Sequence, residues 1–291
     1  MLALVVALQV QVGDVDLFWR EFQAAGRDPQ QTQVRYYAKA SPAWKQYLAA
    51  AGHPEYFVQA LKMYPRFYAS AEPGSRRAAA MTDAIEAALR RFRDLYPSDP
   101  VPVTLGMGRA SLAGRATAGR VFLSAEMFSR GPETDMTGLT RWHHWALAPP
   151  ERIVAAAVHE AVHLHQVEVN EPALAVACLR EGAADWIAER ITGASTKPET
   201  AAWCRPRRKE IFRRLAASSP MLYEGWLYSG EMQEGGPPPD MGYWAGSEIV
   251  ASYYRRAKDK AAAMRDIVEM RDPRKIILES DYRWMLKRRS R

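Results

Sequence analysis

The stretch AAAVHEAVHLHQ, residues 155–166, places His159 and His163 four positions apart, with Glu160 directly after the first of them. On a helix, residues four apart lie on one face, about 40° apart around the axis, so both imidazoles can reach one point. In the pattern H-E-x-x-H the histidines bind zinc and the glutamate lies beside the open position of the metal. There it takes a proton from zinc-bound water, whose pKa zinc lowers from about 15.7 to about 7, and passes it to the leaving amine. We therefore predict that His159 and His163 are zinc ligands and that Glu160 is the general base.

A third ligand is expected because zinc at a catalytic site takes three protein ligands and keeps one position open. Glu181 follows His163 by eighteen positions, in LREGAADWIAE, and Asp185 comes one helical turn later. If the two helices pack antiparallel, Glu181 completes the metal site. Asp185 then accepts the N–H of a ligating histidine, which fixes the tautomer and raises the basicity of the imidazole. Gly182 lacks a Cβ and is expected to let these two helices approach closely at the metal.

The same residues also allow structural interpretations. Hydrogen-bonded histidines in a core helix would account for residues 155–166, and a solvated helix edge would account for Glu181 and Asp185. The small apolar residues around both motifs favour the metal site, because polar side chains on such helices are costly without partners. His165 points to another face and is not expected to bind zinc, whereas Gln166 lies nearer the ligand face. His143 and His144 are expected in a loop, with surface or packing roles.

The surrounding periodicity predicts the elements that position these residues. Apolar residues at helical spacing, capping residues and prolines predict helices, and two β-type runs predict strands joined by a connection over 109–119. The helices are expected at 14–26, in two short segments of 41–70, at 75–97, from Glu151 through the histidine motif, at about 171–193 with Gly193 as its end, and at 245–257. The strands are expected at 101–108 and 119–128, and a loop at 130–150. Residues 200–291 are expected to be mainly helical.

The composition is that of an ordinary globular chain. About 48% of the 291 residues are hydrophobic and 25% are charged, with a net charge of +7. The charge is mild for this length, and neither an arginine-rich arm nor zinc-finger spacing occurs, so no nucleic-acid partner is expected. Cys178 and Cys204 form either one disulfide or, by default, two buried thiols.

The first twelve residues leave localisation open. The apolar run from Leu2 to Leu8 is too short to span a bilayer. A buried strand with Leu4, Val6 and Leu8 on one side explains it, and so does a truncated signal segment at 1–12. The chain is therefore expected in the cytoplasm or exported, and no transmembrane span is expected.

The combination of His159-Glu160-x-x-His163 with Glu181-Gly182-Ala183-Ala184-Asp185 resembles the gluzincins, the thermolysin-like zinc metallopeptidases. The chain also resembles an uncharacterised bacterial group of predicted zinc-dependent proteases, some of them lipoproteins. That similarity extends to DVDLFW, GRATAGRVFLSAEMF, ITGAS and GYWAGSEIVASYY, and so covers most of the chain.

The predicted elements, without an internal repeat or a clear linker, favour a single mainly helical domain over 1–291 with a small sheet beside the H-E-x-x-H helix. The resemblance implies that this α+β fold is zincin-like. It implies Zn²⁺ held by His159, His163 and Glu181, Glu160 as general base, and Asp185 behind the ligands. It also implies that the strand at 119–126 forms the edge of the cleft, to which a peptide adds as a strand. The gap between His163 and Glu181 is slightly shorter than in thermolysin, and no calcium-loop signature occurs.

A peptidase also needs a donor for the oxyanion that forms on the attacked carbonyl. Tyr243, beside the Gly-rich loop at 235–242, is the candidate, although a packing aromatic explains it equally well. Arg255 or His144 can serve instead. The expected function is zinc-dependent hydrolysis of peptide bonds in a peptide or protein substrate. The alternative is a non-catalytic binding protein in which zinc clamps two helices. The sequence leaves the substrate, the cleavage mode and the oligomeric state open.

Overall fold

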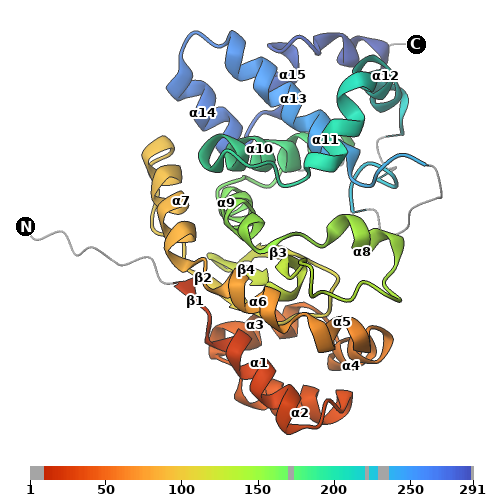
Figure 1. The fold of residues 1–291 in the computed structure, drawn as a ribbon. Coiled ribbons are helices and arrows are strands. Elements are labelled where there is room, and N and C mark those ends of the chain that lie inside the picture. Colours follow the sequence, from red (N-terminus) through yellow and green to blue (C-terminus); the bar gives the residue numbers. More distant parts are fainter. Residues whose placement is uncertain (1–9, 170–173, 220–222, 229–235, 290–291) are drawn as a thin grey trace, which may run out of the picture. The chain divides into compact units, whose positions relative to one another are not determined.

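The computed structural model describes residues 10–169, 174–219, 223–228 and 236–289. They form a mainly helical α+β structure with a small four-stranded sheet, which confirms the predicted fold class at that level (Figure 1). The interpretations given to residues 1–9 lie outside the described residues. Among the helices of the described part, none is long and apolar enough to cross a membrane.

The sheet has the strand order β1-β2-β4-β3, from strands Val10–Gln11, Val103–Gly106, Arg120–Ser124 and Gly114–Thr117. Strands β1, β2 and β4 are parallel, and β3 pairs antiparallel with β4. Ala118 and Gly119 both have positive φ, at 49° and 70°, as a tight two-residue hairpin between β3 and β4 requires.

Two predictions about this sheet are wrong. The segment 109–119 is more than a connection, because it contains β3. The strand at 119–126 is not the edge, because β4 lies between β2 and β3, and β3 is the last strand among those described. The sequence GRAT of β3 is short and polar and carries little of the apolar signal that marks a strand.

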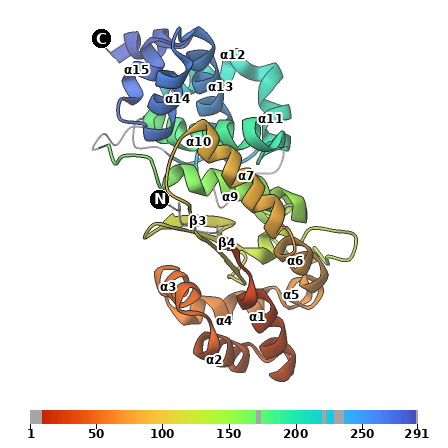
Figure 2. The ribbon, with the colours of Figure 1, turned by 90° about the vertical axis from the view of Figure 1, so that its left-hand side faces the viewer.

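From residue 10 onward, seven helices precede β2, and five of them have proline in the first turn, where its missing N–H costs no hydrogen bond. They are α1 (Gly13–Ala24), α2 (Pro29–Lys39), α3 (Pro42–Ala50), α4 (Pro54–Met63), α5 (Pro65–Ser70), α6 (Glu72–Ala79) and α7 (Thr82–Leu95). Helices α1 and α3 contact β2. Figure 2 shows α1 to α4 on one face of the sheet and α9 on the other. The core formed by α1, α2, α4 and α5 is aromatic, with Phe18, Tyr36, Phe57 and Tyr68 buried together.

This part of the chain differs from expectation at two places. Helix α2 was not predicted, although Asp28 caps it by accepting a hydrogen bond from the backbone N–H of Gln31 (2.7 Å). The single helix expected at 75–97 is two helices that break at Ala80 and Met81; α6 buries the small residues Ser75 and Ala78, whereas α7 buries Ile85, Leu89 and Phe92.

Helix α8 (Arg141–Ala146) replaces part of the loop expected at 130–150. Thr140 and His143 form a capping box at its start. A short 3₁₀ turn at Pro150–Arg152 leads into α9 (Ile153–His163), the predicted histidine helix.

The remaining helices centre on α10 (Leu174–Thr192), which buries most of its length and exposes Glu189 and Arg190 near its end. It ends as predicted at Gly193, whose φ is +73°. Its main partner is α13 (Met241–Arg256). The other helices are α11 (Pro198–Cys204), α12 (Arg208–Ala217), α14 (Lys260–Glu269) and α15 (Pro273–Leu278).

The close approach of α10 and α13 depends on two facing glycines. A Cβ on Gly246 would lie 1.7 Å from the carbonyl oxygen of Cys178, and a Cβ on Gly182 would lie 2.2 Å from the backbone nitrogen of Ser247. The helix that packs closely against Gly182 is therefore α13. The histidine helix α9 was expected at this position, and that expectation is wrong. Cys178 and Cys204 are free and buried, so the thiol interpretation is confirmed.

The contacts within the chain gather in two compact units, residues 1–90 with 98–161, and residues 91–97 with 162–291. The division falls inside the continuous helix α9. The single-domain organisation stays a prediction.

Candidate metal centre

Helix α9 carries the two histidines in a stretch made almost entirely of small apolar residues. Ala155, Ala157, Val158, Ala161 and Val162 are fully buried, so the helix lies in the core and His159 is only 8% exposed. The four-residue spacing places His159 and His163 on one face, as predicted.

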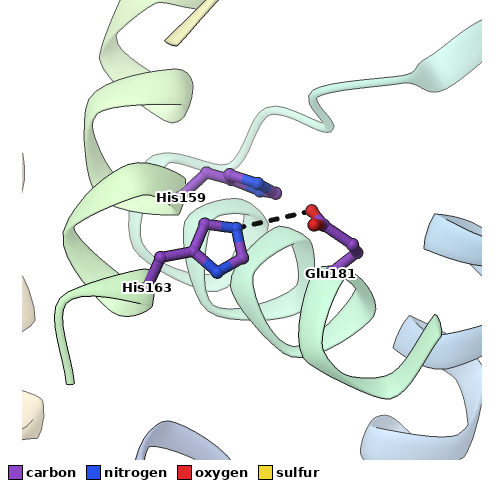
Figure 3. A group of neighbouring side chains, drawn as sticks. All are labelled: His159, His163 and Glu181. Atoms are coloured by element: carbon purple, nitrogen blue, oxygen red, sulfur yellow. Dashed lines mark ion pairs between the residues drawn. The ribbon is translucent and has the colours of Figure 1, made fainter. Parts of the chain in front are cut away.

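The structure brings the three predicted ligands together. His159, His163 and Glu181 each offer one ligand atom, and these atoms all lie within 4.8 Å of one another. Figure 3 shows the two imidazoles of α9 turned toward the carboxylate of α10. The Nε2 atom of His163 lies 3.4 Å from Oε2 of Glu181. Ligand atoms of a tetrahedral zinc site with bonds of about 2.1 Å lie roughly 3.4 Å apart, so this pair already has the required separation.

The donor set fits a catalytic type of zinc site. Two imidazole nitrogens and one carboxylate oxygen are ligands that zinc accepts, and three protein ligands leave a position for water or substrate. Glu181 is 8% exposed, and a carboxylate buried on an apolar helix is costly without a compensating charge. A divalent cation bound by this group would supply that charge.

Gln166 fixes the orientation of His163. Its Oε1 lies 2.9 Å from Nδ1 of His163, and its Nε2 donates to the carbonyl oxygen of Arg180 (2.8 Å). Arg180 in turn donates to the carbonyl oxygen of Val167 (2.6 Å). With Nδ1–H donating to Gln166, the lone pair of Nε2 is directed toward Glu181, as a metal ligand requires.

Tyr228 was missed by the sequence analysis. Its hydroxyl donates to Oε1 of Glu181 (2.7 Å). Most of the Tyr228 side chain is exposed, but its hydroxyl is partly buried against Glu181; this desolvation and the charge of Glu181 raise the pKa of Tyr228, so the phenol stays protonated and acts as a donor. Tyr228 lies forty-seven positions from Glu181, in a stretch of the sequence without any motif, so no local signal pointed to it.

Asp185 lies one turn after Glu181, as predicted, and its Oδ1 accepts a hydrogen bond from the hydroxyl of Thr196 (2.6 Å). Its expected contact with a ligating histidine stays a prediction. The ammonium of Lys197 lies nearby, 3.4 Å from Asp240.

Tyr243, the predicted oxyanion donor, lies in the first turn of α13, and the Lys197 ammonium stands 4.3 Å from the centre of its ring. Burial, followed by the charge of Glu181, raises the pKa of Tyr243 well above its ordinary value, so its hydroxyl also stays protonated. Its catalytic role stays a prediction. Arg255, the alternative, lies about 18 Å further along the same helix and pairs with Asp281 (2.6 Å).

Glu160, the predicted general base, lies against the start of β3. A Cβ added to Gly114 would lie 2.8 Å from both Cγ and Oε1 of Glu160. The missing side chain of Gly114 therefore makes the space in which the Glu160 carboxylate lies. This glycine was not singled out from the sequence.

A buried network holds the loop that leads to β3. Glu126 is fully buried and accepts hydrogen bonds from the backbone N–H groups of Gly108 (2.8 Å) and Ala110 (3.0 Å). Nε2 of His143 lies 2.9 Å from the carbonyl oxygen of Ala110. Burial raises the pKa of Glu126 to about 7 and lowers that of His143. His143 thus has the packing role expected of it, on a helix and not in a loop.

His165 and His144 are not part of the metal-ligand group. His165 follows the end of α9 and packs against the rings of Phe92 and Tyr96, with centroid distances of 5.7 and 5.2 Å. His144 is exposed on α8.

Comparison of the chain with protein-family models, curated proteins and solved structures finds no match. The sequence motifs and the geometry of the centre are therefore the grounds on which a function can be argued.

Proposed function

We propose that this chain is a zinc-dependent peptidase of the gluzincin type. The observation that carries the proposal is the convergence of His159, His163 and Glu181 on one point, with Glu160 next in sequence to the first ligand. A site that only stabilises a fold tends to have four protein ligands, whereas this group has three among the described residues.

Zinc held by these residues would act as a Lewis acid on a substrate carbonyl and lower the pKa of a coordinated water to about 7. Glu160 takes a proton from the attacking water and delivers it to the leaving amine. Tyr243, protonated at neutral pH, is the proposed donor to the oxyanion of the attacked carbonyl.

The proposed place for the substrate is β3. It is the last strand of the described sheet, and Gly114 at its start lies against Glu160. A peptide that pairs with β3 as an added strand gains backbone hydrogen bonds without needing a particular side chain. Its scissile bond would then run past the general base.

The second candidate is a binding protein in which zinc clamps α9 to α10. The buried positions of His159 and Glu181 fit this function equally well. Glu160 distinguishes the peptidase from the binding protein, because a zinc site that only joins two helices does not require a general base.

The test compares Glu160→Gln with the matched variant Glu168→Gln, which alters an exposed glutamate shortly after α9. Zinc content is measured by elemental analysis, and turnover with a library of quenched fluorescent peptides. We expect about one zinc per chain in the wild type and in both variants. Hydrolysis should fall by at least a hundredfold in Glu160→Gln alone. A Glu160→Gln protein that keeps full activity would overturn the mechanism. A zinc-loaded wild-type chain that cleaves no peptide would favour the clamp.

A further inference from the structure

Tyr228 ends a short turn that is held firmly to the helices behind it. Trp226 and Leu227 are each 1% exposed, and their backbone N–H groups both donate to the carbonyl oxygen of Tyr223 (2.9 Å). The backbone N–H of Gly242 donates to the carbonyl oxygen of Trp226 (2.8 Å). The position of Tyr228 is therefore set by two buried neighbours and by the start of α13.

The side chain of Tyr228 lies outside the core, with the ring of Tyr223 stacked beside it. The residue is 67% exposed, and its φ is +55°, in the left-handed region that aromatic residues rarely adopt. Non-glycine residues in this conformation cluster at sites where the strain serves a function. Here the strained backbone directs the hydroxyl onto a buried carboxylate.

The contact distinguishes the two oxygens of Glu181. Oε1 accepts the hydrogen bond of Tyr228 (2.7 Å), whereas Oε2 lies 3.4 Å from Nε2 of His163. One oxygen therefore faces the phenol and the other faces the imidazole. The hydrogen bond from the phenol draws electron density from Oε1, so Oε2, which faces the imidazole, is the stronger donor to a metal.

We propose that Tyr228 is a positioning residue that holds Glu181 as a one-oxygen ligand and so keeps a coordination position of the metal open. This inference rests on the metal-binding part of the proposed function. Because a carboxylate that binds through both oxygens occupies an additional position, the hydrogen bond preserves the place at which water or a substrate carbonyl binds.

The experiment uses the full chain stripped of metal and reloaded with Co²⁺ or Zn²⁺. Tyr228→Phe keeps the ring and the left-handed backbone and removes only the hydroxyl. Tyr223→Phe is the matched control, because its ring stacks on that of Tyr228 at 6.4 Å in the same turn. Visible absorption of the Co²⁺ protein reports the coordination number, since four-coordinate Co²⁺ absorbs more strongly than five-coordinate Co²⁺. Competition with a chromophoric chelator gives the zinc dissociation constant.

We expect Tyr228→Phe to lose visible Co²⁺ absorption and to raise the zinc dissociation constant about tenfold or more, and Tyr223→Phe to match the wild type. A Tyr228→Phe protein with an unaltered Co²⁺ spectrum overturns the inference, whether or not its affinity falls. A wild-type chain that binds neither metal overturns the inference and the zinc mechanism together. A wild-type chain that binds metal but cleaves no peptide overturns the peptidase proposal alone, because the spectra test Tyr228 without activity.

Discussion

Nε2 of His163 and Oε2 of Glu181 lie 3.4 Å apart, although eighteen positions of sequence separate the two residues. The contact joins the last residue of α9 to the second turn of α10. Gln166 holds His163 from the other side, and Tyr228 holds the second oxygen of Glu181. Both side chains are thus oriented by hydrogen bonds before any ion is considered.

The first prediction concerns Glu181 as a ligand. Glu181→Ala should bind zinc at least a hundredfold more weakly than the wild type, because it leaves two of the three protein ligands. Isothermal titration with Zn²⁺ measures the change. Glu189→Ala removes an exposed carboxylate from the same helix and should bind as the wild type does. If Glu181→Ala and the wild type bound zinc with equal affinity, Glu181 would not be a metal ligand.

That His159 and His163 share one face could be predicted from the sequence because helical geometry is local. The spacing of His159 and His163 fixes their common face once a helix forms, and small apolar residues with prolines before them mark that helix in the sequence. Glu181 required one further step, the packing of a second helix. That packing could be expected because the residues around Glu181 are small and apolar, and Gly182, Ala183 and Ala184 are buried in the structure.

The supporting residues could not be predicted, because they depend on contacts between distant segments. Gly182 looked suited to the histidine helix, but the backbone that it admits belongs to α13. Gly114 lies in β3, whose short polar sequence does not predict a strand. The left-handed backbone of Tyr228 cannot be inferred from its residue type, since such a conformation in tyrosine is imposed by the surrounding fold.

The second prediction concerns the space that Gly114 leaves for Glu160. In Gly114→Ala the new Cβ would lie 2.8 Å from Oε1 of Glu160, so the flexible carboxylate must move aside. If Glu160 is the general base, kcat should fall by up to about a hundredfold, while zinc content and the melting temperature change little. Gly13→Ala is the control, because nothing lies within 4 Å of its new Cβ. An unchanged kcat would show that the position of Glu160 does not limit the reaction.

The third prediction concerns the contact between α10 and α13. In Gly246→Ala the Cβ would lie 1.7 Å from the carbonyl oxygen of Cys178, and backbone cannot move aside as a side chain can. The helices must separate, so the free energy of unfolding should fall by about 3 kcal/mol or more. Urea denaturation measures it against Gly13→Ala. A stability within 0.5 kcal/mol of the wild type, on the order expected of a surface change, would mean that the helices do not approach so closely.

The fourth prediction follows from the burial of Glu126. Its pKa is raised from 4.5 to about 7, so the folded chain favours the protonated form. The contribution of protonated Glu126 to the free energy of unfolding is fully present below about pH 4.5 and is lost as the pH rises to about 7. The difference between the two pKa values corresponds to ~3 kcal/mol.

Glu126→Gln should remove this dependence on pH. A carboxamide can accept from only one of the two backbone N–H groups, which costs ~1 kcal/mol at low pH. It does not ionise, however, so above pH 7 the variant should be the more stable protein, by ~2 kcal/mol. Urea unfolding at pH 4.5, 6 and 8 measures the slope, with Glu55→Gln as an exposed control. If Glu126→Gln retained the wild-type slope between pH 4.5 and 7, another group would have to be responsible for it.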